Sequence, residues 1–145
     1  MSIIVENRKI YFEYEIEYTL EAGIVLLGSE VKAIRNGQIN IIDGHIILRK
    51  DGPYLVNTTI NKYTQSAKIL EIDPKRNRKL LLNKAEIRKL FGKMSVKGFT
   101  IVPLNVHTKN GRIKIEIAVV KGKKMHDKRK SLKEKDLERE RRRGV

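Results

Sequence analysis

Residues 21 to 44, EAGIVLLGSEVKAIRNGQINIIDG, change their hydrophobic period twice, and this constrains the fold more than any other stretch. Residues 23 to 27 form a short apolar run bounded by glycines, which favours a buried strand over a helix. Ser29 is suited to cap a helix of about two turns, and Asn36-Gly37 to end it in left-handed backbone. The stretch predicts a strand, a helical plug and a second strand. Such a plug closes the end of a small β-barrel, although this stretch alone favours a plain packing joint.

Residues 9 to 18, KIYFEYEIEY, alternate between apolar and polar side chains and predict a half-buried strand. One face of this strand carries Glu13, Glu15 and Glu17, so it should point away from any polyanion. The opposite face, expected inside, consists of Ile10, Phe12, Tyr14, Ile16 and Tyr18.

Two hairpins follow from turn signals. Asp51-Gly52 predicts a turn between strands at 45 to 50 and 54 to 60, and Lys109-Asn110-Gly111 predicts one between strands at 99 to 106 and 112 to 119. Pro103 indicates that its strand lies at an edge or carries a bulge.

A short strand is expected at 69 to 72, and Asn83 should cap a helix that ends at Gly92 with Ile87, Leu90 and Phe91 inside. Together these elements predict a mainly β fold: an antiparallel OB-like β-barrel of about six strands with short capping helices.

The charge balance favours nucleic acid as the partner. Lys and Arg total 32 against 17 Asp and Glu, a formal net charge of +15 that attracts polyanions. An anionic membrane is the second candidate, disfavoured because Trp and a long amphipathic helix are missing. The loop at 75 to 79, KRNRK, is expected to be exposed, and Leu80 to Leu82 to be buried. The helix after this loop should present a basic outer face formed by Lys84, Arg88, Lys89 and Lys93.

Enzymatic chemistry finds no support in the sequence. His45, His107 and His126 fall on different elements, without carboxylates or thiols at the spacing that catalysis or metal binding requires. Phosphate loops and nucleophile elbows are missing. With no Cys, no signal peptide and no apolar span, we expect a cytoplasmic, non-enzymatic protein without cofactors or metals.

The chain changes character near its end. Residues 1 to 121 are predicted to be the β domain, and residues 122 to 145 a basic tail. This tail has high helix propensity but too few apolar residues to pack, so we expect it to be disordered until a polyanion neutralises it.

Five motifs in order closely resemble the SsrA-binding protein family, also called small protein B. They are Asn7-Arg8-Lys9, EAGIVLLGSEVKAIRNG, DPKRNRKLLLNKAEI, GFTIVPL and VKGKKMHDKR. The resemblance runs from Asn7 to Arg129 and implies a bacterial trans-translation factor. Such a factor binds the tRNA-like domain of tmRNA and accompanies alanyl-tmRNA and elongation factor Tu to stalled ribosomes. Its tail occupies the decoding centre.

The resemblance also implies the functional residues. RNA-binding positions carried over by motif are Asn7, Glu21, Leu81, Asn83 and Lys114, to which we add Lys32 and Arg35 from the outward face of the predicted helix. The ribosome-binding tail positions are Gly122, Lys123, Lys124, His126, Asp127, Lys128 and Arg129. The chain departs from the family at Gln38, often Lys, and at His107-Thr108, which replaces a more usual Tyr and aromatic pair.

Two other functions are consistent with the composition. A ribosomal-protein-like or RNA-chaperone barrel would bind many RNAs through charge alone, with a steep salt dependence and little preference. A nuclease would use a histidine such as His126 and would cleave RNA.

Overall fold

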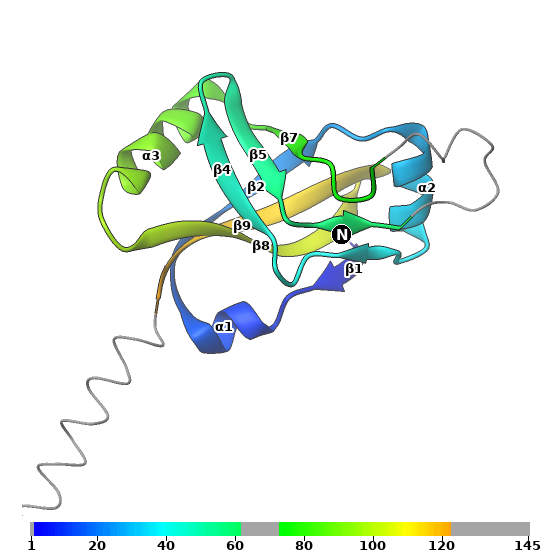
Figure 1. Cartoon of the computed structure of the whole chain (residues 1–145), viewed down its shortest axis with the longest axis horizontal. Coiled ribbons are helices and arrows are strands. Elements are labelled where there is room, and N and C mark those ends of the chain that lie inside the picture. Colours follow the sequence, from blue (N-terminus) through cyan, green and yellow to red (C-terminus); the bar gives the residue numbers. More distant parts are fainter. Residues whose placement is uncertain (1, 62–72, 123–145) are drawn as a thin grey trace, which may run out of the picture.

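The computed structural model describes residues 2–61 and 73–122. Over these residues the chain is mainly β, as predicted, with three short helices around an antiparallel sheet (Figure 1). The strands are β1 (Ser2–Glu6), β2 (Tyr14–Ile24), β3 (Ile39–Asn40), β4 (His45–Arg49), β5 (Gly52–Val56), β6 (Thr59–Ile60), β7 (Arg78–Leu81), β8 (Phe99–Lys109) and β9 (Arg112–Gly122). The helices are α1 (Lys9–Glu13), α2 (Gly28–Arg35) and α3 (Lys84–Met94).

The main sheet has seven strands in the order β1-β8-β9-β2-β7-β5-β4, and all neighbouring strands are antiparallel. Strands β3 and β6 form a separate pair. β4, at one end of the sheet, lies against β8 near the other end, so the sheet curves back toward itself. Helices α2 and α3 lie at opposite ends of this curved sheet (Figure 1). The predicted antiparallel architecture with short helices is thereby confirmed.

Both predicted hairpins form. β8 and β9 turn at Asn110 and Gly111, whose φ angles of 52° and 75° are the left-handed pair that a two-residue hairpin turn requires. β4 pairs with β5 across Asp51, where Gly52 adopts a φ of 129°. The register of β8 against β9 shifts between Pro103 and Asn105, so the bulge alternative for Pro103 is confirmed. The strand expected at 69 to 72 lies outside the described residues.

The strand predicted over residues 9 to 18 is wrong in its first half. Residues 9 to 13 form helix α1, and Phe12, expected inside, is 80% exposed. β9 ends at Gly122, opposite Tyr14, so residues before Tyr14 have no partner on that strand. The helical turn instead lets Ile10 pack on Val102 and Leu104. From Tyr14 onward the predicted alternation holds, with Glu15 and Glu17 exposed.

The boundaries of α2 and α3 differ from the prediction. β2 ends at Ile24, and Val25 and Leu27 are exposed because they lead into α2 instead of continuing the strand. Leu27, not Ser29, is the N-cap residue of α2, and its backbone N–H donates to Glu30 Oε1 at 2.9 Å. Only Gly37 of the Asn36-Gly37 pair is left-handed. α3 buries Leu90 but leaves Phe91 exposed, and it continues past Gly92 to Met94.

A charged cluster lies inside the protein where α2 meets β7. Arg78 is fully buried and donates from Nε and Nη2 to Oε2 of Glu30 at 2.9 and 2.7 Å. Its Nη1 donates to the Thr58 carbonyl at 3.2 Å, and Nη2 also donates to the Pro74 carbonyl at 2.9 Å. Arg76 binds both oxygens of the same carboxylate. The loop at 75 to 79 is therefore not the fully solvated basic loop that its composition predicts.

Burial raises the pKa of the Glu30 carboxyl, but hydrogen bonds from Arg76, the Leu27 amide and Arg78 outweigh that effect and hold the pKa below its ordinary value. Glu30 is thus an ionised acceptor for two guanidinium groups. It joins α2 to residues that are far away in the sequence, at 76 and 78.

We predict that Glu30→Gln lowers the free energy of unfolding by about 3 kcal/mol, because it removes the charge that compensates a buried guanidinium. Urea unfolding measures the change. Glu15→Gln, at an exposed position on β2, is the matched control and should stay within about 0.5 kcal/mol of the wild type. Equal effects of the two substitutions would contradict the prediction.

The same variant tests the pH dependence. Since the pKa of Glu30 is lowered by folding, the unfolded state takes up the proton first as the pH falls below about 4.3. The stabilisation is complete above the pKa of the unfolded state and is lost as the pH falls through the lower pKa of the folded state. Acid destabilisation should therefore be shallower in Glu30→Gln than in the wild type.

Candidate nucleic-acid interface

The strand register brings several predicted site residues to one face of the sheet. Gly23 on β2 lies opposite both Leu81 on β7 and Lys114 on β9, and directly opposed residues of antiparallel strands point to the same face. Glu21, two residues before Gly23, shares this face because side chains alternate along a strand. We call this face of the sheet, which carries Glu21, Gly23, Leu81 and Lys114, the Lys114 face.

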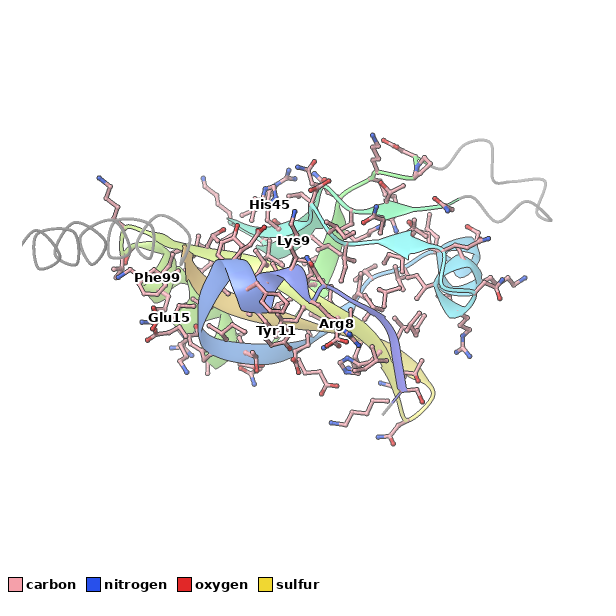
Figure 2. All side chains as sticks on the ribbon, turned by 90° about the horizontal axis from the view of Figure 1, so that it is seen from below. Arg8, Lys9, Tyr11, Glu15, His45 and Phe99 are labelled. Atoms are coloured by element: carbon pink, nitrogen blue, oxygen red, sulfur yellow. The ribbon has the colours of Figure 1, made fainter. Side chains whose placement is uncertain are left out.

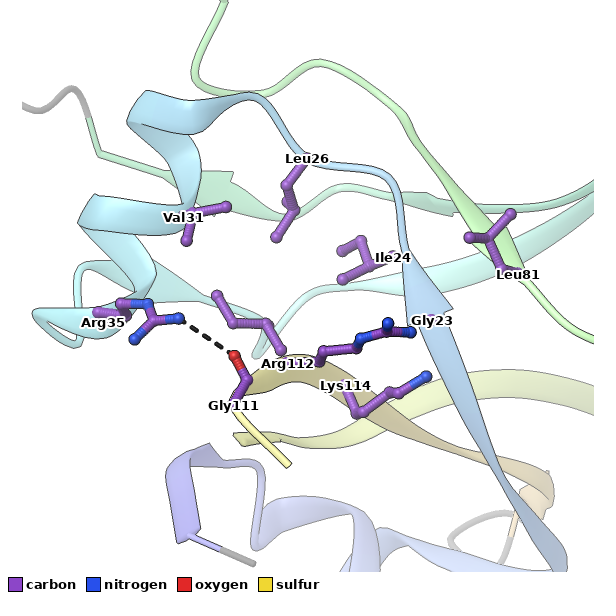
Figure 3. Close-up of a pocket in the computed structure, with 10 residues that line it drawn as sticks. Gly23, Ile24, Leu26, Val31, Arg35, Leu81, Gly111, Arg112 and Lys114 are labelled. Atoms are coloured by element: carbon purple, nitrogen blue, oxygen red, sulfur yellow. Dashed lines mark hydrogen bonds between the residues drawn. The ribbon is translucent and has the colours of Figure 1, made fainter. Parts of the chain in front are cut away.

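A cavity of about 340 Å³ opens on the Lys114 face between α2, β2 and the β8–β9 turn (Figure 3). Three predicted RNA-binding residues from three different elements line it: Arg35, Leu81 and Lys114. The remaining lining residues are Gly23, Ile24, Leu26, Val31, Gly111, Arg112 and Ile113. The cavity thus combines cations with apolar side chains. Cations contact phosphate groups of a nucleic acid, and apolar side chains pack against the faces of a ribose or base.

Two features keep this cavity open and cationic. The first is Gly23, which has no side chain. A Cβ built there would lie only 3.2 Å from the Cβ of Leu81, another residue that lines the cavity. Arg35 donates from Nη2 to the Gly111 carbonyl at 3.2 Å and so connects α2 to the hairpin turn. Arg112 and Lys114 extend from β9 in the same direction, as Figure 3 shows.

Leu81 was expected to be buried with its neighbours, but only Leu80 is fully inside. Leu81 is 55% exposed, because it points to the Lys114 face while Leu80 points to the core. This exposure makes Leu81 available to a ligand. Arg112 is a cavity residue that the sequence analysis missed, although its spacing of two from Lys114 was a usable signal.

Glu21 is held by side chains of β8. Its Oε1 lies 2.7 Å from Nε2 of His107, and its Oε2 accepts from Lys109 Nζ at 3.2 Å. The hydrogen bond from His107, followed by that from Lys109, lowers the pKa of the Glu21 carboxyl below its ordinary value. Glu21 therefore presents a fixed negative charge beside a cationic cavity.

Asn83 and Lys32 are exposed at the edges of this region. Asn83 follows β7 and caps α3: its Oδ1 accepts from the Glu86 backbone N–H at 2.8 Å, and the Glu86 carboxylate accepts from the Asn83 N–H at 3.2 Å. The predicted capping role is confirmed. Arg35 lines the cavity, whereas Lys32, one turn earlier on α2, is exposed outside it.

Asn7 is not brought to the Lys114 face. It is buried, its backbone N–H donates to the Leu104 carbonyl at 2.7 Å, and its Nδ2 donates to the Ile42 carbonyl at 3.2 Å. It lines a second cavity of about 340 Å³, to which α1 and the start of β4 also contribute. Figure 2 shows Lys9 and His45 on this side of the molecule.

The basic face of α3 is partly engaged by the sheet. Lys89 Nζ lies 4.0 Å from the centre of the Tyr18 ring, and Lys93 Nζ lies 4.5 Å from that of Phe99. Lys93 also pairs with Glu17 at 3.0 Å. These two lysines therefore hold α3 against the sheet instead of forming a purely solvated patch.

Gly122 is the last residue of β9 and is exposed opposite Tyr14. The other predicted tail positions, Lys123, Lys124, His126, Asp127, Lys128 and Arg129, lie outside the described residues. Within residues 2–61 and 73–122, no helix is long and apolar enough to cross a lipid bilayer. The same ranges contain no group of three or more acidic or histidine side chains placed to hold a metal ion.

The fold and the cavity define a small antiparallel β protein with a cationic, partly apolar cavity on one face of its sheet. Comparison with known proteins then gives the family. The family model described as SmpB protein matches residues 4–145, so this chain belongs to the SmpB family.

Similar proteins agree over most of the chain. This chain is 47% identical to the SsrA-binding protein of Leptothrix cholodnii, and the match covers 94% of this chain and 89% of that protein. It is 48% identical to the SsrA-binding protein of Burkholderia lata, covering 94% and 93%. A solved structure described as "tmRNA-SmpB: a journey to the center of the bacterial ribosome" contains a chain with 39% identity and a TM-score of 0.67, covering 82% of this chain and 83% of that one.

We predict that Asn83→Ala lowers the free energy of unfolding by about 1 kcal/mol, because α3 loses its side-chain cap. Asn83→Asp keeps an acceptor for the Glu86 N–H and should be close to the wild type. Thermal or urea unfolding separates the two substitutions. A loss as large for Asp as for Ala would show that Asn83 stabilises the protein by something other than capping.

Proposed function

We propose that this chain binds the tRNA-like domain of tmRNA and delivers tmRNA to stalled ribosomes in trans-translation. The observation that carries the proposal is the cavity that joins Arg35, Leu81 and Lys114, with Glu21 and Asn83 each two residues along the chain from the lining residues Gly23 and Leu81. The relatives named SsrA-binding protein and the solved tmRNA-SmpB structure support the same activity.

Each group at the cavity has a role that its chemistry suits. Lys114, Arg112 and Arg35 contact phosphates of the RNA, and Leu81 packs against a ribose or base. Glu21 accepts hydrogen bonds from base N–H groups. A phosphate of the RNA has no N–H group to donate to this carboxylate, so Glu21 distinguishes bases from the backbone. The combination recognises a folded RNA by shape and by a few placed polar contacts.

The other residues in the proposal have secondary roles. Asn83 offers its amide to the RNA from the start of α3, Lys32 adds positive charge on α2, and Asn7 contributes at the second cavity. The protein acts as a non-enzymatic, cytoplasmic monomer that meets elongation factor Tu on alanyl-tmRNA.

Residues 1 to 121 dock on tmRNA, and the tail from 122 to 145 occupies the decoding centre and mRNA path of the small subunit. The tail contacts the ribosome through Gly122, Lys123, Lys124, His126, Asp127, Lys128 and Arg129.

Sequencing the RNA that copurifies with the full chain from cells tests the proposal. tmRNA should be strongly enriched, and bulk tRNA at physiological salt should compete poorly with the isolated tRNA-like domain. A protein that binds through charge alone would instead show a steep salt dependence and equal competition by bulk tRNA, and this result would refute the proposal.

Lys114→Gln should weaken binding of the tRNA-like domain by about tenfold and reduce the salt slope by about one, because one phosphate contact is lost. Filter binding at several salt concentrations measures both quantities. Lys50→Gln, in the exposed β4–β5 turn outside the cavity, removes the same charge and serves as the matched control. If the two substitutions weaken binding equally, net charge and not the cavity determines affinity.

Truncation after Gly122 should leave binding of the tRNA-like domain nearly unchanged but abolish tagging of stalled products. The cut follows Gly122 because β9 pairs with β2 up to that residue, and an earlier cut would shorten the sheet. In vitro tagging and RNA binding are measured on the same preparation. Simultaneous loss of both activities would contradict the separation into a docking domain and a tail.

A further inference from the structure

His107 lies on the Lys114 face at the centre of a polar cluster. It is on β8, opposite Lys114 of β9 and Ile3 of β1, and only 1% of its side chain is exposed. Buried histidines need partners for both ring nitrogens. One of its partners is Glu21, whose side chain is 34% exposed and lies on the same face of the sheet as Lys114.

Both ring nitrogens of His107 face oxygen acceptors. Nδ1 lies 2.7 Å from Oδ1 of Asn105, and Nε2 lies 2.7 Å from Oε1 of Glu21. The Asn105 amide is oriented by its other end, since its Nδ2 donates to the Glu116 carboxylate at 3.5 Å. Reversing the amide would place two acceptor oxygens, one from Asn105 and one from Glu116, against each other. Because the pKa of the Glu21 carboxyl is lowered and the carboxylate only accepts, the proton of this contact is on Nε2, and Asn105 holds the ring from its other nitrogen.

The charged groups around the ring are of both signs. Glu21 on β2 and Glu116 on β9 are the carboxylates on the same face, and Glu6 lies opposite Asn105 on β1. The cations are Lys109, which is bound to Glu21, and Lys114, the register partner of His107. The two lysines offset the carboxylates and keep cationic groups available to a polyanion.

We propose that His107 is a positioning residue for RNA recognition. Its ring is held by Asn105 and donates to Oε1 of Glu21. This contact fixes the Glu21 carboxylate so that the remaining lone pairs of the carboxylate meet base N–H donors. Each carboxylate oxygen can accept two hydrogen bonds, and His107 and Lys109 use one on each oxygen. The exposed lone pairs select bases over phosphates, which a carboxylate repels. His107 thereby determines specificity and not general affinity. The inference rests on the proposed function, in which Glu21 contacts RNA.

Binding of the tRNA-like domain by the full chain, with bulk tRNA as a second ligand, tests the inference in four proteins: wild type, His107→Gln, Glu21→Gln and the double variant. His107→Gln should weaken binding of the tRNA-like domain about tenfold and leave binding of bulk tRNA unchanged. The double variant should be no weaker than Glu21→Gln, because His107 acts only through Glu21. Additive losses in the double variant, or equal losses for both RNAs, would overturn the proposal.

A measurement on the free wild-type protein does not depend on how any variant folds. The ¹⁵N chemical shifts of the His107 ring should show a proton on Nε2, the nitrogen that faces Glu21, and an unprotonated Nε2 would refute the positioning geometry. If instead Nε2 is protonated but the wild type does not prefer the tRNA-like domain, the proposed function fails and the inference fails with it. A selective wild type with an unaffected His107→Gln variant would overturn only the inference.

Discussion

The buried ion cluster of Glu30 with Arg76 and Arg78 is the interaction on which the arrangement of the site depends. It joins α2, which carries Arg35, to β7, which carries Leu81. A buried charge without its partner is costly, so this contact admits few alternative positions for α2. Both elements line the cavity, and its shape therefore depends on three side chains, those of Glu30, Arg76 and Arg78, that do not line it themselves.

The same cluster shows what the sequence could not reveal. The run KRNRK contains only cations, and nothing local distinguishes a solvated arginine from one that reaches a carboxylate 48 residues away. Similarly, the alternation at residues 9 to 18 is consistent with a strand, but β9 ends opposite Tyr14, so the first half had no such partner. Turns and caps, by contrast, are encoded locally: Asn83, Gly111 and Gly37 adopt the predicted conformations.

The candidate site was predictable in its residues but not in its geometry. Arg35, Leu81 and Lys114 were singled out from motifs and charge, and only strand register shows that they share a cavity. The sequence analysis treated His107 as a histidine without catalytic or ligand partners at the required spacing. Its two acceptors, Asn105 and Glu21, come from β8 and β2, and the sequence gives no indication that the two strands place them around one ring.

Strand β9 carries Lys114 near its start and ends at Gly122, where the described part of the chain also ends. Eight residues of extended strand span roughly 27 Å. Because β2 and β8 pair with this strand on its two sides, the distance between the cavity and Gly122 is fixed by the sheet. Inserting a single residue within β9 would lengthen the distance from Lys114 to Gly122 by only about 3 Å. The same insertion would also exchange the two faces of the strand beyond it, so Lys114 and Gly122 could not both keep their present strand partners.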